Sequence, residues 1–178
     1  MDRNRTEMTN DQVLDFIIDE FEGTKFVDHP DDRGGPTKFG ITKKTLSGWR
    51  GRSVRTNDIH ELTKKEAKAI YLDRYVVPVR GGDFQSGLLR LAVVDYAVHS
   101  GTRRAIKAIQ EIVKTSPDGV MGPITFEAVK GYGENKLFTK LMAERFVFLA
   151  KLVSRDATQA TFIYGWAKRL AMILERSA

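Results

Sequence analysis

The sequence contains no cysteine among its 178 residues, which excludes disulfide bonds and thiolate metal sites. Its stability must therefore come from packing, as suits a protein made in a reducing cytosol. Proline is scarce, with five residues, and no stretch rich in proline, glycine and serine is long enough to separate free domains. The three histidines, His29, His60 and His99, lack metal-ligand spacing. We expect neither a metal nor a cofactor.

Long apolar runs are missing as well. No stretch reaches the roughly 18 apolar residues that a membrane-spanning helix requires. The opening segment, MDRNRTEMTNDQ, is polar and charged, unlike the apolar centre of a secretory signal. The sequence therefore predicts no membrane anchor and no signal peptide, and we expect synthesis in the cytoplasm.

The composition that remains is that of a folded protein, with 42% hydrophobic and 29% charged residues. The length allows one compact domain, or one lobe with a smaller lobe packed against it. The formal net charge of +6 favours acidic partners such as nucleic acid, anionic lipid or a bacterial cell wall. Charge does not choose among these partners, and a basic surface can also serve solubility alone.

Helical periodicity runs through most of the chain. A capping-box pattern at Thr9-Asn10-Asp11-Gln12 predicts the start of a first helix, and Gly23 predicts its end. Residues 86–99 are apolar nearly all round, which predicts a central helix buried on several sides. The other predicted helices cover about 63–77, 102–113, 134–153 and 160–176, and Gly122-Pro123 predicts the start of a short helix. The last of them has apolar residues on one side: Ile163, Trp166, Leu170, Ile173 and Leu174.

Only residues 24–45 lose the helical period. Gly34-Gly35-Pro36 and Gly40 interrupt this segment, which favours short strands or a hairpin over a helix. We expect a basic loop with Trp49 to follow, between about Lys43 and Arg55. Basic and aromatic residues occur together in nucleic-acid binders as well as in sugar clefts, although a solvated loop of this kind requires no function.

Glu22 has the setting of a general acid. It lies at the end of the first helix, where the helix dipole disfavours a negative charge, and desolvation by Phe21 and Phe26 would raise its pKa further. Cleavage of a glycosidic bond needs a carboxyl group that keeps its proton near neutral pH. The alternative is an exposed carboxylate paired with Lys25. Glu20, which lacks the neighbouring motif, is interpreted as solvated.

A second polar group must serve the opposite face of the sugar. The segment after Glu22 offers four such groups: Asp28, Asp31, Asp32 and Thr37. Gly34-Gly35 allows the backbone to turn back toward the end of the helix. The spacing therefore predicts a cleft, with the acid on the helix and its partner on the hairpin.

The pattern Glu22-Gly23 followed by Asp32-x-Gly34-Gly35-x-Thr37-x-x-Gly40-Ile41-Thr42 resembles the signature of the glycoside hydrolase family 108 N-acetylmuramidases. These enzymes occur as phage endolysins and as bacterial muramidases used in secretion. The resemblance implies that Glu22 is the catalytic acid and that Asp32 and Thr37 are its partners. Thr24 departs from the pattern, because the family has a second glycine at that position.

The same segment also resembles the Glu, Asp, Thr triad of the phage-type lysozymes. The spacing of that triad selects Asp31 and Thr37 as the partners of Glu22. We favour Asp32 as the second catalytic residue, because it belongs to the fuller motif, and we assign Asp31 to substrate binding.

The second half of the chain resembles the peptidoglycan-binding region that accompanies this family. The matching residues are Asp95, Ser100-Gly101, Gln110, Asp118-Gly119-x-x-Gly122-x-x-Thr125 and Phe162-x-x-Gly165-Trp166-x-x-Arg169. We expect Asp95, Tyr96 and Trp166 to contact substrate. A charge in an apolar helix needs partners, so a structural tie is the alternative for Asp95. Trp166 can equally belong to the core, and Asp118-Gly119 can be a simple turn.

We therefore predict a mainly α, lysozyme-like α+β fold with a small β-hairpin and a helical C-terminal part. Residues 1–83 are expected to form the catalytic lobe, with the hairpin at about 24–45, and residues 84–178 a peptidoglycan-binding part packed on it. The expected activity is hydrolysis of the β-1,4 bond between N-acetylmuramic acid and N-acetylglucosamine. We expect a monomer that binds glycan strands and no nucleic acid. A holin or an export system would give it access to the periplasmic cell wall.

Two other interpretations stay open at this point. A lytic transglycosylase also uses one glutamate but leaves anhydro ends in place of reducing ends. A non-catalytic module that binds cell wall or nucleic acid would fit the charge. Whether hydrolysis inverts or retains the anomeric configuration depends on the separation of two carboxyl groups.

Overall fold

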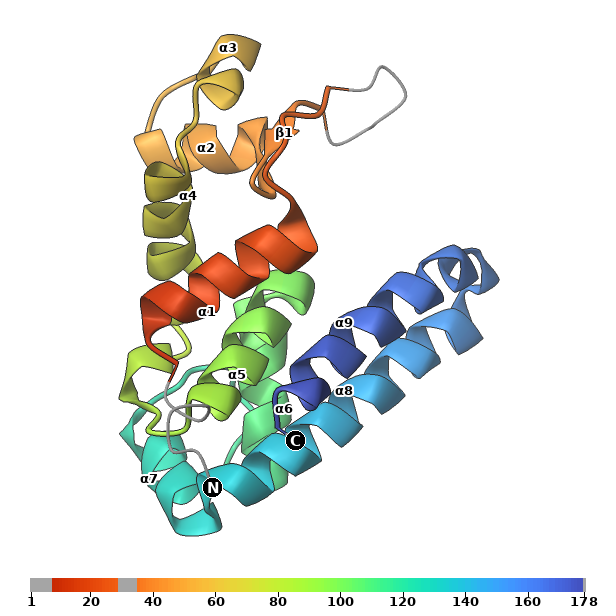
Figure 1. The fold of residues 1–178 in the computed structure, drawn as a ribbon. Coiled ribbons are helices and arrows are strands. Elements are labelled where there is room, and N and C mark those ends of the chain that lie inside the picture. The colour runs from red at the N-terminus through yellow and green to blue at the C-terminus, as the bar shows by residue number, and fades with distance from the viewer. Residues whose placement is uncertain (1–7, 29–34, 178) are drawn as a thin grey trace. The chain divides into compact units, whose positions relative to one another are not determined.

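The computed structural model describes residues 8–28 and 35–177. The described chain forms two compact units (Figure 1): one is Asp11–Arg74, and the other contains residues 8–10 and the residues from Tyr75 onward. Helices make up most of each unit, and the sheet is a single antiparallel pair of short strands in the first one. The predicted fold class, mainly α and lysozyme-like with a small hairpin, is confirmed.

The first unit places its hairpin between helices. Its elements are α1 (Asn10–Ile17), η2 (Ile18–Glu22), β1 (Thr37–Lys38), β2 (Ile41–Thr42), α2 (Lys43–Arg50), α3 (Thr56–His60) and α4 (Lys64–Tyr71). The helices and β2 contribute buried apolar side chains, including Val13, Ile17, Ile18, Ile41, Leu46, Ile59, Ile70 and Tyr71. Thr63 caps α4, where its side chain accepts the Glu66 N–H, the usual role of threonine at a helix N-terminus.

The segment expected to be a basic loop is largely helical, so that prediction is wrong. Thr42 ends the hairpin and caps α2, because its hydroxyl accepts the Thr45 N–H at 3.2 Å. Arg50, in the last turn of α2, forms ion pairs of 2.8 Å with Asp58 and Glu66. Leu46 is the buried residue of this helix, and a single buried residue leaves no apolar period in the sequence.

The second unit is built around α5 (Gly87–Ser100). The turn η3 (Leu72–Val76) contains the boundary between the units, and the other elements are η4 (Gly81–Asp83), α6 (Thr102–Val113), α7 (Pro123–Tyr132), α8 (Glu134–Arg155), η5 (Ala157–Phe162) and α9 (Ile163–Glu175). Helix α5 packs against α6, α8 and α9, and α6 lies beside it in Figure 1. Nine of its residues are buried. The prediction of a central helix over 86–99 is confirmed.

The last helix is less covered than its sequence predicts. Leu170 and Ile173 are buried, whereas Ile163 is 39% exposed and Leu174 45% exposed. The apolar face of α9 is therefore wider than the surface that covers it. In the described part of the chain, none of the helices is both long enough and apolar enough to cross a membrane.

Candidate active site

Glu22 is the last residue of a π-helical turn that follows α1. The Gly23 N–H donates to the carbonyl of Ile18, five residues earlier, at 2.9 Å. Gly23 has a φ of 79°, a conformation that glycine adopts without a steric penalty. The turn therefore ends at this position, and the Glu22 side chain is half-buried. Single π turns inside helices occur frequently at functional sites.

The two rings expected to flank Glu22 have ring partners of their own in the first unit. Phe21 packs edge-on against Phe16, and Phe26 packs edge-on against His60, with centroid distances of 5.2 Å in each pair. These contacts anchor the end of the first helix and the chain that leaves it.

The hairpin forms where the sequence predicts β structure. Thr37 pairs with Thr42 and Lys38 with Ile41. Val27, on the chain that leaves Gly23, forms a further bridge to Thr37, with N–H to carbonyl distances of 2.9 and 2.8 Å. The segment after the helix therefore runs beside β1, as a hairpin carrying a catalytic partner requires.

The turn between the strands lies against the Glu22 side chain. Gly40 has a φ of 71°, and a Cβ placed there would lie 2.8 Å from Glu22 Oε2 and 2.9 Å from Glu22 Cβ, and would overlap the Tyr71 hydroxyl. Tyr71 is buried in α4 and donates to the carbonyl of Phe39 at 3.0 Å. The carboxyl group of Glu22 is thus held between the hairpin turn and the end of its own helix.

The partner residues are described only in part. Thr37 is half-buried, and its hydroxyl donates to the carbonyl of Gly35 at 3.0 Å. Asp31 and Asp32 lie outside the described residues, so the choice between them stays a prediction. Within residues 8–28 and 35–177, no group of three or more His, Asp or Glu side chains is placed to hold a metal ion.

Asp95 lies inside the second unit and is 0% exposed. Its Oδ2 is 2.6 Å from Arg145 Nη1, and its Oδ1 accepts from Arg169 Nε at 2.9 Å. Burial alone would raise the pKa of Asp95, but the charges of Arg145 and Arg169 outweigh burial and hold that pKa below its ordinary value. This arrangement supports the structural alternative for Asp95, because its side chain is closed to a ligand.

Tyr96 is also 0% exposed. Its hydroxyl donates to Glu144 Oε2 at 3.0 Å, and burial raises the pKa of the phenol above its ordinary value. Tyr96 is therefore placed to hold α5 against α8, and its contact with substrate stays a prediction. Trp166 is partly exposed and stacks on Phe162 with a centroid distance of 5.9 Å, so it can still meet a ligand.

Gln110 organises the Asp118-Gly119 turn. It is 1% exposed, and its amide donates to Asp118 Oδ1 at 2.7 Å and to Thr125 Oγ1 at 3.1 Å, while its Oε1 accepts the Gly119 N–H at 2.8 Å. The hydrogen bond from Gln110 lowers the pKa of Asp118. The hydrogen bonds of Gln110 with Asp118 and Thr125 thus connect α6 to the turn before α7 and to α7 itself.

Sequence reasoning missed three residues of these sites. Tyr71 belongs to the predicted helix over 63–77, and nothing in its spacing points to the hairpin turn. Arg145 lies in a helix of mixed polarity, and its burial depends on α5. Arg169 belongs to the terminal motif, but the motif does not show that it pairs with Asp95.

A helix-borne glutamate held against a short hairpin, in a mainly α-helical chain, is the arrangement of a lysozyme-like glycoside hydrolase. The profile described as Glycosyl hydrolase 108 matches residues 14–101, and the profile described as Predicted Peptidoglycan domain matches residues 104–171. The solved structure of Brucella abortus SagA is similar, with a TM-score of 0.80 and 36% identity, over 94% of this chain and 91% of that one. No curated protein sequence matches the chain. The chain belongs to glycoside hydrolase family 108, and it is a peptidoglycan hydrolase.

Proposed function

We propose that this hydrolase is an N-acetylmuramidase that cleaves the β-1,4 bond between N-acetylmuramic acid and N-acetylglucosamine, with Glu22 as the general acid. The observation that carries the proposal is the position of the Glu22 carboxyl group, at the end of the π turn and against Gly40. A carboxyl group held in this way can give its proton to the leaving oxygen as the glycosidic bond breaks.

Asp32 is the proposed second catalytic residue, with Asp31 in a substrate-binding role. Asp32 would orient water or stabilise positive charge on the sugar ring. Thr37 would position the water, because its hydroxyl already donates to Gly35 and its oxygen keeps lone pairs that can accept from water. Trp166 would stack on a sugar face.

Replacing the acid tests the proposal directly. Glu22→Gln keeps the size of the side chain and removes its acidic proton, so lysis of purified sacculi should fall by roughly 100-fold or more. Glu20→Gln is the matched control, since Glu20 is exposed and two residues earlier in the same turn. Turbidity loss of sacculi measures both rates. Native lysis by the Glu22 variant would refute the assignment.

The chemistry of the bond is tested by the products. Mass spectrometry of digested peptidoglycan should show reducing N-acetylmuramic acid ends. Anhydro ends would identify a lytic transglycosylase, and reducing N-acetylglucosamine ends would place the cleavage at the other glycosidic bond.

The two aspartates are distinguished by a paired substitution. We expect Asp32→Asn to lower the rate on sacculi by roughly 100-fold, in the range of a lost catalytic carboxylate. Asp31→Asn should mainly raise KM, because a binding residue contributes equally to the ground and transition states. A reversed pattern would assign the catalytic role to Asp31.

Cellular context completes the proposal. Residues 1–83 would act as the catalytic lobe and residues 84–178 as the peptidoglycan-binding part of a monomer. An endolysin role, with synthesis in the cytoplasm and release through a holin or an export system, would bring it to the periplasmic cell wall.

A further inference from the structure

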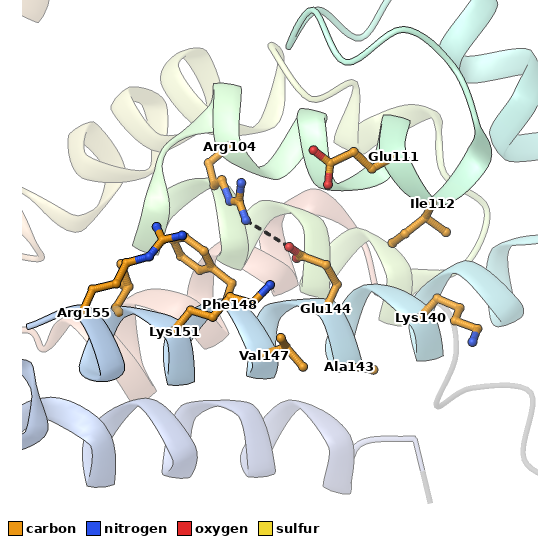
Figure 2. A pocket seen from close by; sticks show the side chains of 11 residues that line it. Arg104, Glu111, Ile112, Lys140, Ala143, Glu144, Val147, Phe148, Lys151 and Arg155 are labelled. Atoms are coloured by element: carbon orange, nitrogen blue, oxygen red, sulfur yellow. Dashed lines mark hydrogen bonds and ion pairs between the residues drawn. The ribbon is translucent and has the colours of Figure 1, made fainter.

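A groove of about 650 Å³ runs between α6 and α8 of the second unit. Figure 2 shows side chains from the two helices facing one another across it. Its floor is apolar and includes Ile112, Val147, Phe148 and Leu152. Its charged lining consists of four cations and two carboxylates: Arg104, Lys140, Lys151, Arg155, Glu111 and Glu144. The groove therefore has a surplus of two positive charges.

Two of the six charged groups, Arg104 and Glu144, neutralise one another. Arg104 donates to Glu144 at 3.0 Å, and its guanidinium lies 4.2 Å from the centre of the Phe148 ring. Arg104 is thus already occupied by α8. In the described part of the chain, Lys140, Lys151 and Arg155 form no ion pair, so these cations are available to an anionic ligand.

The spacing of the available cations limits the ligand. Lys140 and Lys151 are eleven residues apart on α8, which corresponds to roughly 16 Å along the helix axis. An extended peptide of about five residues covers roughly 17 Å. A short extended peptide with separated carboxylates and apolar side chains is therefore long enough to meet both ends of the groove and its apolar floor.

We infer that this groove binds the acidic stem peptides of peptidoglycan, which rests on the proposed function of the chain as a muramidase. Free carboxylates of the stem pair with Lys140 at one end and with Lys151 and Arg155 at the other. The methyl groups of its alanines lie on the apolar floor between them. The second unit thereby recognises the peptide, while the glycan strand remains available to Glu22.

Binding to defined fragments tests this assignment. In a Glu22→Gln background, which leaves the ligand intact, a soluble disaccharide-peptide fragment is titrated by calorimetry against Lys140→Glu and Lys151→Glu. Each substitution should weaken binding about fivefold, the range of a partly exposed ion pair, and added salt should reduce the difference. Lys168→Glu, an equal charge change at an exposed position on α9, should leave affinity unchanged. Lys151→Arg should retain it.

Peptide-free glycan strands provide the second arm. Their affinity should be the same in the parent and in the Lys140→Glu and Lys151→Glu variants. An equal loss on peptide-free strands would assign the groove to sugars and overturn the inference, as would unchanged affinity for the disaccharide-peptide fragment. If the two substitutions weaken binding to DNA and leave affinity for the disaccharide-peptide fragment unchanged, the ligand is nucleic acid and the inference is overturned. The titration requires no hydrolysis, so a failure of the Glu22 assignment would be seen separately, in the lysis assay.

Discussion

Gly40 combines a left-handed backbone with close contacts on the side where a Cβ would stand. The contacting groups are the Glu22 carboxyl and the Tyr71 hydroxyl, which come from different helices of the first unit. The glycine of the Gly-Ile-Thr motif is therefore explained by space as well as by backbone conformation. Any side chain at this position has to displace the acid or the tyrosine.

Gly40→Ala should consequently impair both activity and stability. We expect a loss of about 1–3 kcal/mol in the free energy of unfolding, the range of an overpacked site, and a fall in lysis of sacculi, because the Glu22 carboxyl group is displaced. Gly51→Ala is the matched control: its φ is 66° with no atom within 4 Å of the added Cβ. It should cost about 1 kcal/mol from backbone strain and leave activity intact. Equal activities in the two variants would contradict this view of Gly40.

Asp95 joins three helices of the second unit. It lies on α5 and pairs with Arg145 of α8 and Arg169 of α9. Two guanidinium groups thus pair with one buried carboxylate, with His99 beside Arg145 at 3.2 Å. This cluster explains why an aspartate occurs in an otherwise apolar helix.

Asp95→Asn should destabilise the chain by about 3–5 kcal/mol, because it leaves buried cations without this counter-charge. Asp83→Asn removes an exposed carboxylate from its pair with Arg80, and should change stability by less than about 1 kcal/mol. Urea denaturation of both variants measures the difference. Similar losses in the two would mean that burial adds nothing to the Asp95 cluster.

The sequence predicts the positions of most helices, because the periodic spacing of apolar residues along a helical face is visible within a few turns of chain. Residues 86–99 are apolar nearly all round, which predicts a central helix buried on several sides. The sequence does not predict helix α2, because Leu46 is its one buried residue and leaves no apolar period. The sequence does not predict the π turn before Gly23 either. Over a single turn, an α-helix and a π-helix have the same pattern of apolar residues, so the pattern does not distinguish them.

The sequence predicts those residues of the candidate site that belong to one short motif. Glu22, Thr37 and Gly40 belong to one short segment, and the structure brings Glu22 and Gly40 into contact. The Tyr71 contact and the two arginines of Asp95 depend on residues more than thirty positions away. Such pairings are set by packing between helices, which a single sequence does not encode as spacing.

At the scale of the whole molecule, the family profiles and the compact units divide the chain differently. The Glycosyl hydrolase 108 profile extends to residue 101 and so includes α5. That helix packs with α6, α8 and α9, which follow the profile. A fragment that ends with the profile would therefore leave the most apolar helix of the chain without its covering partners.

Stability of the whole chain should depend on pH through His99. Burial first, and then the charges of Arg145 and Arg169, lower its pKa from 6.5 to about 4, against the opposing charge of Asp95. Between these two values the unfolded chain binds more protons than the folded one, so the free energy of unfolding falls as the pH falls from 6.5 to 4. Carboxyl groups with lowered pKa, such as Asp95, lose their contribution only below 3.8.

His99→Gln should therefore flatten the stability profile between pH 6.5 and 4 relative to that of the parent. Urea denaturation at intervals across this range provides the measurement. Identical slopes in the parent and in His99→Gln would show that another group controls the acid side.

The π turn at residues 18–22 makes the direction of the Glu22 side chain depend on the number of residues before Gly23. Each residue of an α-helix advances the azimuth by about 100°, and a π turn accommodates one extra residue before the chain leaves the helix. Deleting one residue upstream of Gly23 would restore regular winding and aim the glutamate elsewhere. The number of residues in this turn, as well as their identity, thus helps to fix where the Glu22 carboxyl group lies.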